Sequence, residues 1–220
     1  YPDVQAGREV SIENYYSNYI RTYIERDIRQ LINIKNEIKF TKFISAVAAR
    51  TGQEFNASKI ATEIGIDGKT ADDWISILKN TGIIYLLQSY TNNNATRAVR
   101  TQKVYFMDTG LACYLTGYTD NEVLEKSSYS GAIFETYIIS EIIKSYSNNG
   151  IDPKRYLYFY RDSNQKEIDL LIINNNTVYP VEIKKSSNPG ISAIKNFNVV
   201  DKFNMNNGNG IVLCLCREIN

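Results

Sequence analysis

Acidic and basic side chains interrupt two apolar stretches in the C-terminal half of the sequence. Asp169 lies inside the run EIDLLI (residues 167–172), and Glu182 and Lys184 lie in the run VEIK (residues 181–184). Residues two apart in a strand leave the same face, so Glu182 and Lys184 are expected to point to one side. A charge in a buried strand is costly unless it is paired or holds a metal.

These residue types suit a metal-dependent hydrolase. Asp169 and Glu182 can hold Mg²⁺ through oxygen, helped by a main-chain carbonyl such as that of Ile183. Lys184 can orient or help to deprotonate the attacking water and stabilise the charge that develops on a phosphate. Spacing alone leaves two alternatives open: Glu182 and Lys184 are exposed edge-strand charges, or Lys184 forms a simple ion pair with Asp169.

The amino-acid composition limits the kinds of catalytic and metal site that this chain can form. The 220 residues include no histidine, which excludes Ser-His-Asp and Cys-His nucleophilic catalysis, histidine general bases and most zinc sites. The formal net charge is +1, so the chain as a whole does not attract DNA and local charge must decide. Three cysteines argue against a disulfide framework and indicate a reducing, cytoplasmic environment. Apolar runs are too short to span a membrane, so no membrane partner is expected.

The residues around the charged strands alternate between helical and extended patterns. Apolar spacing predicts helices over residues 132–146 and 191–203. Strands are predicted over residues 155–161, 167–173, 177–184 and 211–215. The tripeptide NNN (residues 174–176) favours a tight hairpin between the second and third of these strands. The polar segment 120–130 is interpreted as a linker.

The apolar spacing of the N-terminal half predicts a helical unit that ends in a β-hairpin. A long amphipathic helix is expected over residues 12–34. Shorter elements follow: helices over 40–50, 58–64 and 69–80, and strands over 83–87 and 104–107. Three helices and a hairpin form the outline of a winged helix-turn-helix. The tripeptide GKT (residues 68–70) is not a phosphate loop, because Glu63 stands where that motif needs glycine.

A basic stretch in this unit favours contact with DNA. Between Asp73 and Asp108 the sequence has no acidic residue. The stretch contains basic residues expected at the end of the third helix and in the wing: Lys79, Arg97, Arg100 and Lys103. Asp72 and Asp73, early in the third helix, would repel phosphate, so docking of a protein is the alternative.

The acid on one strand and the Glu-x-Lys on the next resemble the PD-(D/E)XK nuclease superfamily. The matching residues are Asp169, Glu182, Lys184 and the helical acid Glu135, which ends the motif GAIFE (residues 131–135). The resemblance implies catalytic roles for all four residues, with Asp169 and Glu182 as ligands of Mg²⁺. It also implies a mixed sheet flanked by helices. One departure is that no proline precedes Asp169.

Further motifs are similar to a bacterial and archaeal family of AAA-type ATP-binding proteins whose C-terminal half is catalogued as a domain of unknown function. The motifs are YIERD (23–27), AARTGQ (48–53), VYFMDTGL (104–111) and GAIFE (131–135). In that family a P-loop ATPase module precedes the matching segment. The resemblance therefore implies that ATP binds only in an N-terminal domain missing from this sequence.

These observations predict an α/β chain, α+β overall, in three parts. A helical junction (1–36) and a winged helix-turn-helix (37–119) precede a nuclease-like domain (120–220). The expected function is that of a DNA-associated module of an AAA-type ATPase, with Mg²⁺-dependent phosphodiester hydrolysis. The alternative is a non-catalytic module that binds nucleic acid or protein, including a second copy of itself. The charged strands favour the first function, and the near-neutral net charge favours the second.

Overall fold

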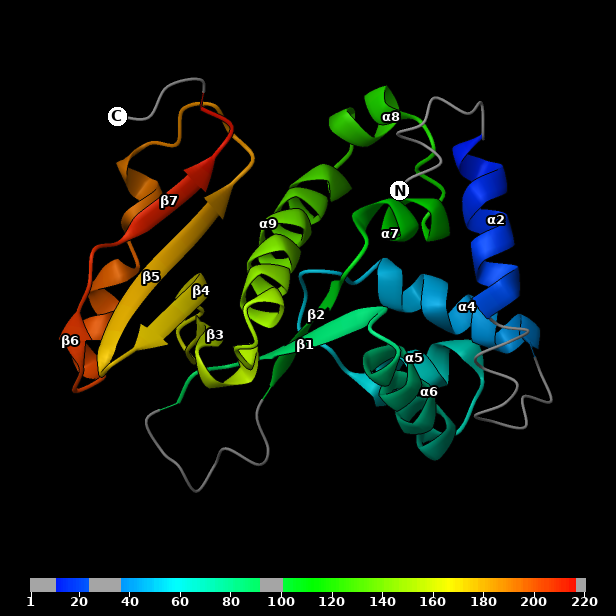
Figure 1. Ribbon diagram of the computed structural model, residues 1–220, viewed down its shortest axis with the longest axis horizontal. Coiled ribbons are helices and arrows are strands. Elements are labelled where there is room, and N and C mark those ends of the chain that lie inside the picture. Colours follow the sequence, from blue (N-terminus) through cyan, green and yellow to red (C-terminus); the bar gives the residue numbers. More distant parts are fainter. Residues whose placement is uncertain (1–10, 24–36, 92–100, 217–220) are drawn as a thin grey trace.

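Helices fill the first half of the chain, and a sheet with one long helix dominates the second half (Figure 1). The structure, a computed structural model, describes residues 11–23, 37–91 and 101–216. In the first half the elements are α2 (Ile12–Thr22), α4 (Glu37–Ala48), α5 (Ala57–Ile64), α6 (Gly68–Asn80), β1 (Ile84–Gln88) and β2 (Gln102–Phe106). The predicted short helices and hairpin are confirmed to within a few residues. Part of the helix expected over 12–34 lies outside the described residues.

Local sequence explains the tight turn between α5 and α6. Asn56 and Asp67 are N-caps, whose side chains accept hydrogen bonds from backbone N–H groups in the first turn of each helix. Gly65 follows α5 with a φ of 72°, a left-handed conformation that glycine adopts readily. The three helices α4, α5 and α6 then enclose fully buried apolar side chains, among them Phe40, Phe43 and Leu78. The winged helix-turn-helix interpretation of this unit stays a prediction.

The second half forms a mixed sheet with helices. Its helices are α7 (Thr109–Leu115), α8 (Asn121–Lys126), α9 (Tyr129–Asn148) and the 3-10 helices η3 (Pro153–Arg155), η4 (Ile191–Ile194) and η5 (Phe197–Lys202). Its strands are β3 (Leu157–Arg161), β4 (Glu167–Asn174), β5 (Thr177–Lys184), β6 (Asn206–Asn207) and β7 (Ile211–Cys214). The strands β3, β4 and β5 are antiparallel, whereas β6 and β7 pair with β5 in parallel. The chain is therefore mixed α+β. Within the described ranges, no helix has both the length and the apolarity needed to cross a bilayer.

The hairpin between β4 and β5 forms as predicted. Asn174 pairs with Thr177, which leaves a loop of Asn175 and Asn176. Both loop residues have positive φ, 47° and 59°, a conformation that asparagine tolerates better than most residues. This turn sets the register of the two strands.

Two predictions for the second half are wrong. The supposed linker 120–130 contains α8, which Asp120 caps through its side chain, and the beginning of α9. The helix expected over 191–203 is instead the pair η4 and η5. Between them the Asn196 side chain donates a hydrogen bond to the main-chain carbonyl of Glu167 at 2.9 Å. Asparagine side chains compete in this way with regular helical hydrogen bonding.

The hairpin of the first half packs against the second half. In Figure 1, α9 lies between the helices of the first half and the sheet strands β5 and β7. Leu87 of β1 and Tyr105 of β2 share one buried cluster with Ile139 of α9 and Phe159 of β3. The backbone N–H of Tyr90 also donates to the carbonyl of Phe159 at 2.7 Å. The two halves therefore share a core at this hairpin.

Candidate active site

Pairing between β4 and β5 places Asp169 across from Glu182. The antiparallel ladder runs from the turn and ends at the pair Leu170↔Val181, and one further step in the same register sets Asp169 opposite Glu182. There Oδ2 of Asp169 accepts a hydrogen bond from the main-chain N–H of Ile183 at 2.8 Å. The carboxylate therefore takes the place of a backbone acceptor at the end of the regular pairing.

A bulge in β4 helps to aim Asp169. Asp169 and Leu170 together lie between ladder positions at which β3 has only Phe159. Bulges increase the local twist and redirect side chains, and they are frequent next to active sites. Leu170 here packs into the buried cluster that includes α9, whereas Asp169 lines a pocket.

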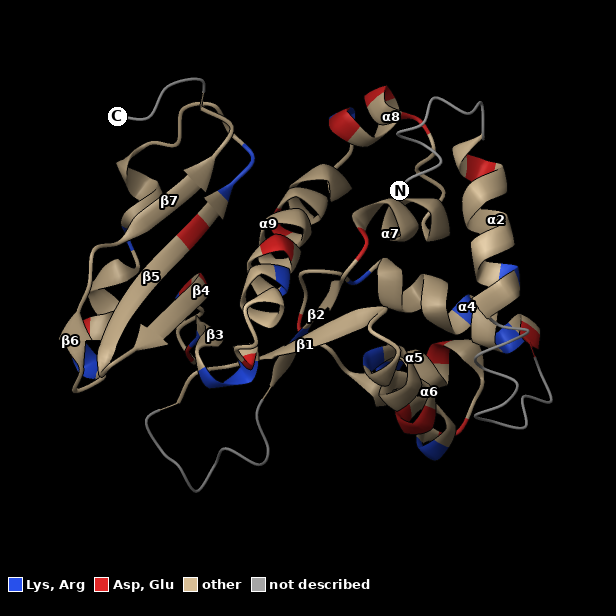
Figure 2. Ribbon diagram, viewed as in Figure 1, with Lys and Arg blue, Asp and Glu red and all other residues tan. Residues whose placement is uncertain are grey.

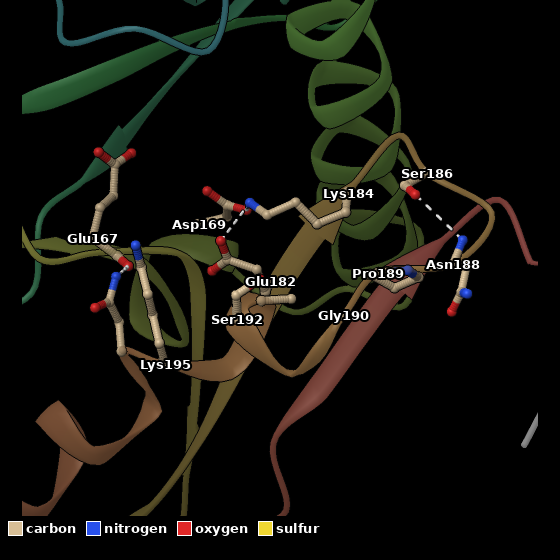
Figure 3. Close-up of a pocket in the computed structure, with 12 residues that line it drawn as sticks. Glu167, Asp169, Glu182, Lys184, Ser186, Asn188, Pro189, Gly190, Ser192 and Lys195 are labelled. Carbon is tan, nitrogen blue, oxygen red and sulfur yellow. Dashed lines mark hydrogen bonds and ion pairs between the residues drawn. The ribbon is translucent and has the colours of Figure 1, made fainter.

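Lys184 forms ion pairs with both carboxylates (Figure 3). Its Nζ lies 2.5 Å from Oε1 of Glu182 and 3.7 Å from Oδ2 of Asp169. The two acids are buried, with exposed fractions of 7% for Asp169 and 8% for Glu182. The predicted convergence of the three side chains is confirmed. The alternative that Glu182 is an exposed edge charge is wrong, because β5 lies inside the sheet between β4 and its parallel partners.

Burial and like charge act together on this cluster. Desolvation, followed by the charge of Asp169, raises the pKa of Glu182, and Lys184 offsets only part of this. The second carboxylate oxygen of Glu182, Oε2, is buried without a hydrogen-bond partner. Burial lowers the pKa of Lys184, but its hydrogen bond to Glu182 and the charge of Asp169 outweigh this and raise it. The cluster thus combines an unsatisfied acceptor with an ammonium that stays protonated at neutral pH.

A pocket of about 550 Å³ opens over these side chains. This volume lies within the range typical of ligand sites. The wall opposite the strands comes from η4 and the segments on either side of it (Figure 3). Beyond the charged cluster and Glu167, its polar lining consists of Ser186, Asn188, Ser192, Lys195 and Asn196. Hydroxyl, amide and ammonium groups of this kind donate to phosphate oxygens in nucleic-acid complexes.

A second ion-pair cluster adjoins the first through Glu167, which lines the same pocket two residues before Asp169. Nζ of Lys103 lies 2.5 Å from Oε1 of Glu167 and 3.3 Å from Oε1 of Glu135. The Tyr105 hydroxyl donates to the same Glu135 oxygen at 2.6 Å. Desolvation raises the pKa of Glu135, and the charge of Lys103 offsets part of the increase.

This second cluster changes the interpretation of two predicted residues. Glu135 is not among the residues that line the pocket; Lys103 and Tyr105 hold it instead. Lys103 is only 3% exposed, so its side chain is not available to a DNA phosphate, and the expected contact is corrected to a buried ion pair. Sequence reasoning missed Glu167 and Tyr105. The position of Glu167, two residues before Asp169 on the same strand, was a usable signal for Glu167.

The other residues predicted to contact DNA are only partly described. Lys79 is exposed near the C-terminal end of α6, and Asp72 and Asp73 are exposed on the same helix. Figure 2 shows the mixture of acidic and basic residues along α6, which lies well apart from β5. Arg97 and Arg100 lie outside the described residues.

The described residues do not form a complete metal cage. Among them, no group of three or more His, Cys, Asp and Glu side chains is placed to hold a metal ion. A cation here would depend on Asp169 and Glu182, with main-chain oxygen or water as further ligands. The unpaired Oε2 of Glu182 fits such a cation, because it is a buried acceptor that lacks a donor.

Two family models together match most of the chain. Residues 1–122 match the Domain of unknown function (DUF8612), and residues 130–219 match the Domain of unknown function (DUF4143). Over 183 residues the chain is 28% identical to the uncharacterized proteins Mb2031c of Mycobacterium bovis and Rv2008c of Mycobacterium tuberculosis. The aligned region covers 83% of this chain but only 40% of each relative. No solved structure matches the chain.

Proposed function

This chain belongs to the DUF8612 family, a domain of unknown function, and we propose that it is a DNA-associated module that hydrolyses phosphodiester bonds with Mg²⁺. The proposed catalytic residues are Asp169, Glu182 and Lys184. The observation that carries the proposal is the buried, unpaired Oε2 of Glu182, which stands beside a second buried carboxylate in a pocket lined by hydrogen-bond donors.

Asp169 and Glu182 would hold the cation. Two buried carboxylates on facing strand positions repel each other when both are ionised. A divalent cation would stabilise both charges and give Oε2 of Glu182 a partner. When bound, the cation would act as a Lewis acid on a phosphoryl oxygen.

Lys184 would act as a donor rather than as a base. Its raised pKa keeps the ammonium protonated at neutral pH. The side chain leans across both carboxylates, and 42% of it is exposed, so it can turn toward a phosphate once a cation neutralises the acids. In that position its charge would stabilise the negative charge that develops on the phosphoryl group, and its N–H groups would orient the attacking water.

Three further features support nucleic acid as the substrate. The pocket that Asp169 and Glu182 line also carries polar donors, including Lys195 (Figure 3). The order of acid, hairpin and Glu-x-Lys resembles the PD-(D/E)XK nucleases. The helical unit resembles a winged helix-turn-helix, which would present Lys79, Arg97 and Arg100 to DNA.

The greater length of the mycobacterial relatives is compatible with the ATP-binding module that the sequence resemblance implies.

A cleavage assay tests the proposal directly. The chain is incubated with labelled single-stranded, linear duplex and branched DNA in Mg²⁺ or Mn²⁺, with EDTA as the metal-free reference. Asp169→Asn and Glu182→Gln should each lower the rate by about 100-fold or more, because each removes a charged ligand. Lys184→Met should retain Mn²⁺ binding in calorimetry and lose rate.

The control variant is Glu141→Gln. Glu141 is also an acid with a lysine partner, Lys144 at 2.7 Å, but it is exposed on α9 and outside the pocket. Its cleavage rate should equal that of the wild type. Cleavage that survives Glu182→Gln would show that the proposed site is wrong.

A non-catalytic interaction module is the second candidate. Lys184 already neutralises part of the charge of Asp169 and Glu182, and the described residues include no three-ligand metal group. Such a module would bind nucleic acid or protein at the same pocket without cutting. DNA binding that is equal in EDTA and Mn²⁺, with no product from any of the three substrates, would favour this function over hydrolysis.

A further inference from the structure

We propose that Lys103 is a positioning residue of the carboxylate site, and that the β1–β2 hairpin thereby couples the helical half of the chain to that site. The inference rests on the proposed function and deepens it. It adds to the site a side chain from the half of the chain that carries neither Asp169 nor Glu182.

Lys103 joins three elements at one buried point. Its ammonium, on β2, contacts Glu167 on β4 and Glu135 on α9, and it lies 5.5 Å from the centre of the Phe159 ring on β3. This distance is suitable for a cation–π contact. The residue is only 3% exposed, so its ammonium is shielded from water, although 30% of the Glu167 side chain remains exposed.

The contact with Glu167 leads directly to the carboxylate site. Glu167 begins β4, two residues before Asp169, and both side chains line the pocket. The bulge at Asp169 and Leu170 lies immediately beyond, where regular pairing with β3 is interrupted. A strand is more easily displaced where its ladder is broken. On the Glu167 side of the bulge, β4 pairs with β3 at two positions, and its ladder with β5 has already ended at Leu170. Lys103 therefore adds a side-chain attachment where β4 has one paired neighbour instead of two.

The other end of this connection is anchored in the helical half. The turn after α4 is hydrogen-bonded to β2. The N–H of Gly52 donates to the main-chain carbonyl of Val104 at 2.8 Å, and the N–H of Val104 donates to the main-chain carbonyl of Gln53 at 3.1 Å. The buried hydroxyl of Thr51 also accepts from the N–H of Phe106 at 3.2 Å. A shift of α4 would therefore move β2, and with β2 the ammonium that positions Glu167.

Replacing Lys103 by a neutral residue removes both its charge and its positioning of Glu167, and the two losses should change the affinity for a divalent metal in opposite directions. Loss of a cation that interacts with the carboxylates of Glu135, Glu167 and Asp169 would, by charge alone, strengthen the binding of a divalent metal. Loss of positioning would weaken it, because residues that orient metal ligands contribute about 10–100-fold to metal affinity. A decrease in affinity can therefore be assigned to positioning.

The experiment measures Mn²⁺ binding to the full chain by calorimetry, together with kcat and KM for DNA cleavage. Lys103→Met should weaken Mn²⁺ binding by about 10-fold or more. It should lower kcat and leave KM unchanged, because a side chain this buried does not touch DNA. Lys103→Arg, which retains the charge, should recover most of both losses. Lys144→Met, which removes the exposed partner of Glu141 on α9, is the matched control and should behave as the wild type.

Lys103→Gln is the second variant in case Lys103→Met does not fold, because glutamine is neutral but still donates hydrogen bonds. Unchanged or stronger Mn²⁺ binding in the folded neutral variant would overturn the inference. A raised KM with unchanged kcat would also overturn it and would restore the DNA-contact interpretation. Wild-type protein that binds Mn²⁺ but cleaves no substrate would refute the proposed hydrolysis alone, since the Mn²⁺ titration still reports on Lys103.

Discussion

Replacement of Glu182 by glutamine should make the metal-free protein more stable at neutral pH and abolish its stabilisation by Mn²⁺. Burial, followed by the charge of Asp169, raises the pKa of Glu182 in the folded chain. For such an acid the folded state binds more protons than the unfolded state, so stability falls as pH rises above the unfolded pKa of about 4.5. Glutamine has nearly the same shape without the charge, so Glu182→Gln removes this loss.

The magnitude of the metal effect follows from mass action. A ligand that binds only the folded chain stabilises it by about 2.7 kcal/mol at a free concentration of 100 times Kd. For a chain of this size, each kcal/mol raises Tm by about 2–4 °C. Saturating Mn²⁺ should therefore raise the Tm of the wild type by about 5–11 °C and leave that of Glu182→Gln nearly unchanged.

Thermal unfolding followed by circular dichroism provides the assay. Wild type, Glu182→Gln and the control Glu141→Gln are compared in EDTA and in Mn²⁺ across a pH series. In EDTA, the advantage of Glu182→Gln over the wild type should be largest at neutral pH and should disappear below the unfolded pKa. Equal stabilisation of Glu182→Gln and wild type by Mn²⁺ would refute the ligand assignment. A stability difference that does not depend on pH would refute the electrostatic reasoning.

The other predictions concern the shared core, a close contact and the basic surface. Thr51→Val should lower the free energy of unfolding in urea by about 1–3 kcal/mol, because the buried Thr51 hydroxyl bonds that of Thr136 at 2.9 Å. Thr51→Ser keeps the hydroxyl and removes one buried methyl group, so its loss should be about 1 kcal/mol. Gly110→Ala should cost about 1–3 kcal/mol, because a Cβ there would lie 2.2 Å from the Tyr16 hydroxyl oxygen, and Tyr16→Phe should recover part of the loss. The basic group consists of Lys79, Arg97 and Arg100. In DNA titrations, each alanine substitution in this group should reduce the slope of log K against log salt by about 0.9. An unchanged slope would favour protein docking.

The carboxylate cluster was predictable because every signal that builds it is local. The turn residues Asn175 and Asn176 accept positive φ, so β4 and β5 can have only one register. In that register Asp169 faces Glu182, and the two-residue period of a strand brings Lys184 to the same side. No distant contact is needed for the convergence.

Local signals were insufficient where side chains compete with the backbone. The apolar spacing of 191–203 is typical of a helix, but the Asn196 side chain bonds the distant carbonyl of Glu167, and two 3-10 helices result. The segment 120–130 is so polar that it suggested a linker. None of the residues of α8 is buried there, and the one clear signal was the capping residue Asp120.

The sequence by itself determined which chemistry is available to this protein: carboxylates, lysines and tyrosines, but no histidine. Only the tertiary structure decided that Lys103 pairs with Glu135 and Glu167 beside the carboxylate cluster. Lys103 stands in an acid-free, polar stretch that is typical of an exposed wing, and its partners lie on α9 and β4, far along the chain. Packing of β2 against those elements excludes water from its ammonium. A buried charge is then so costly without a counter-ion that Lys103 pairs with Glu135 and Glu167 instead of facing solvent.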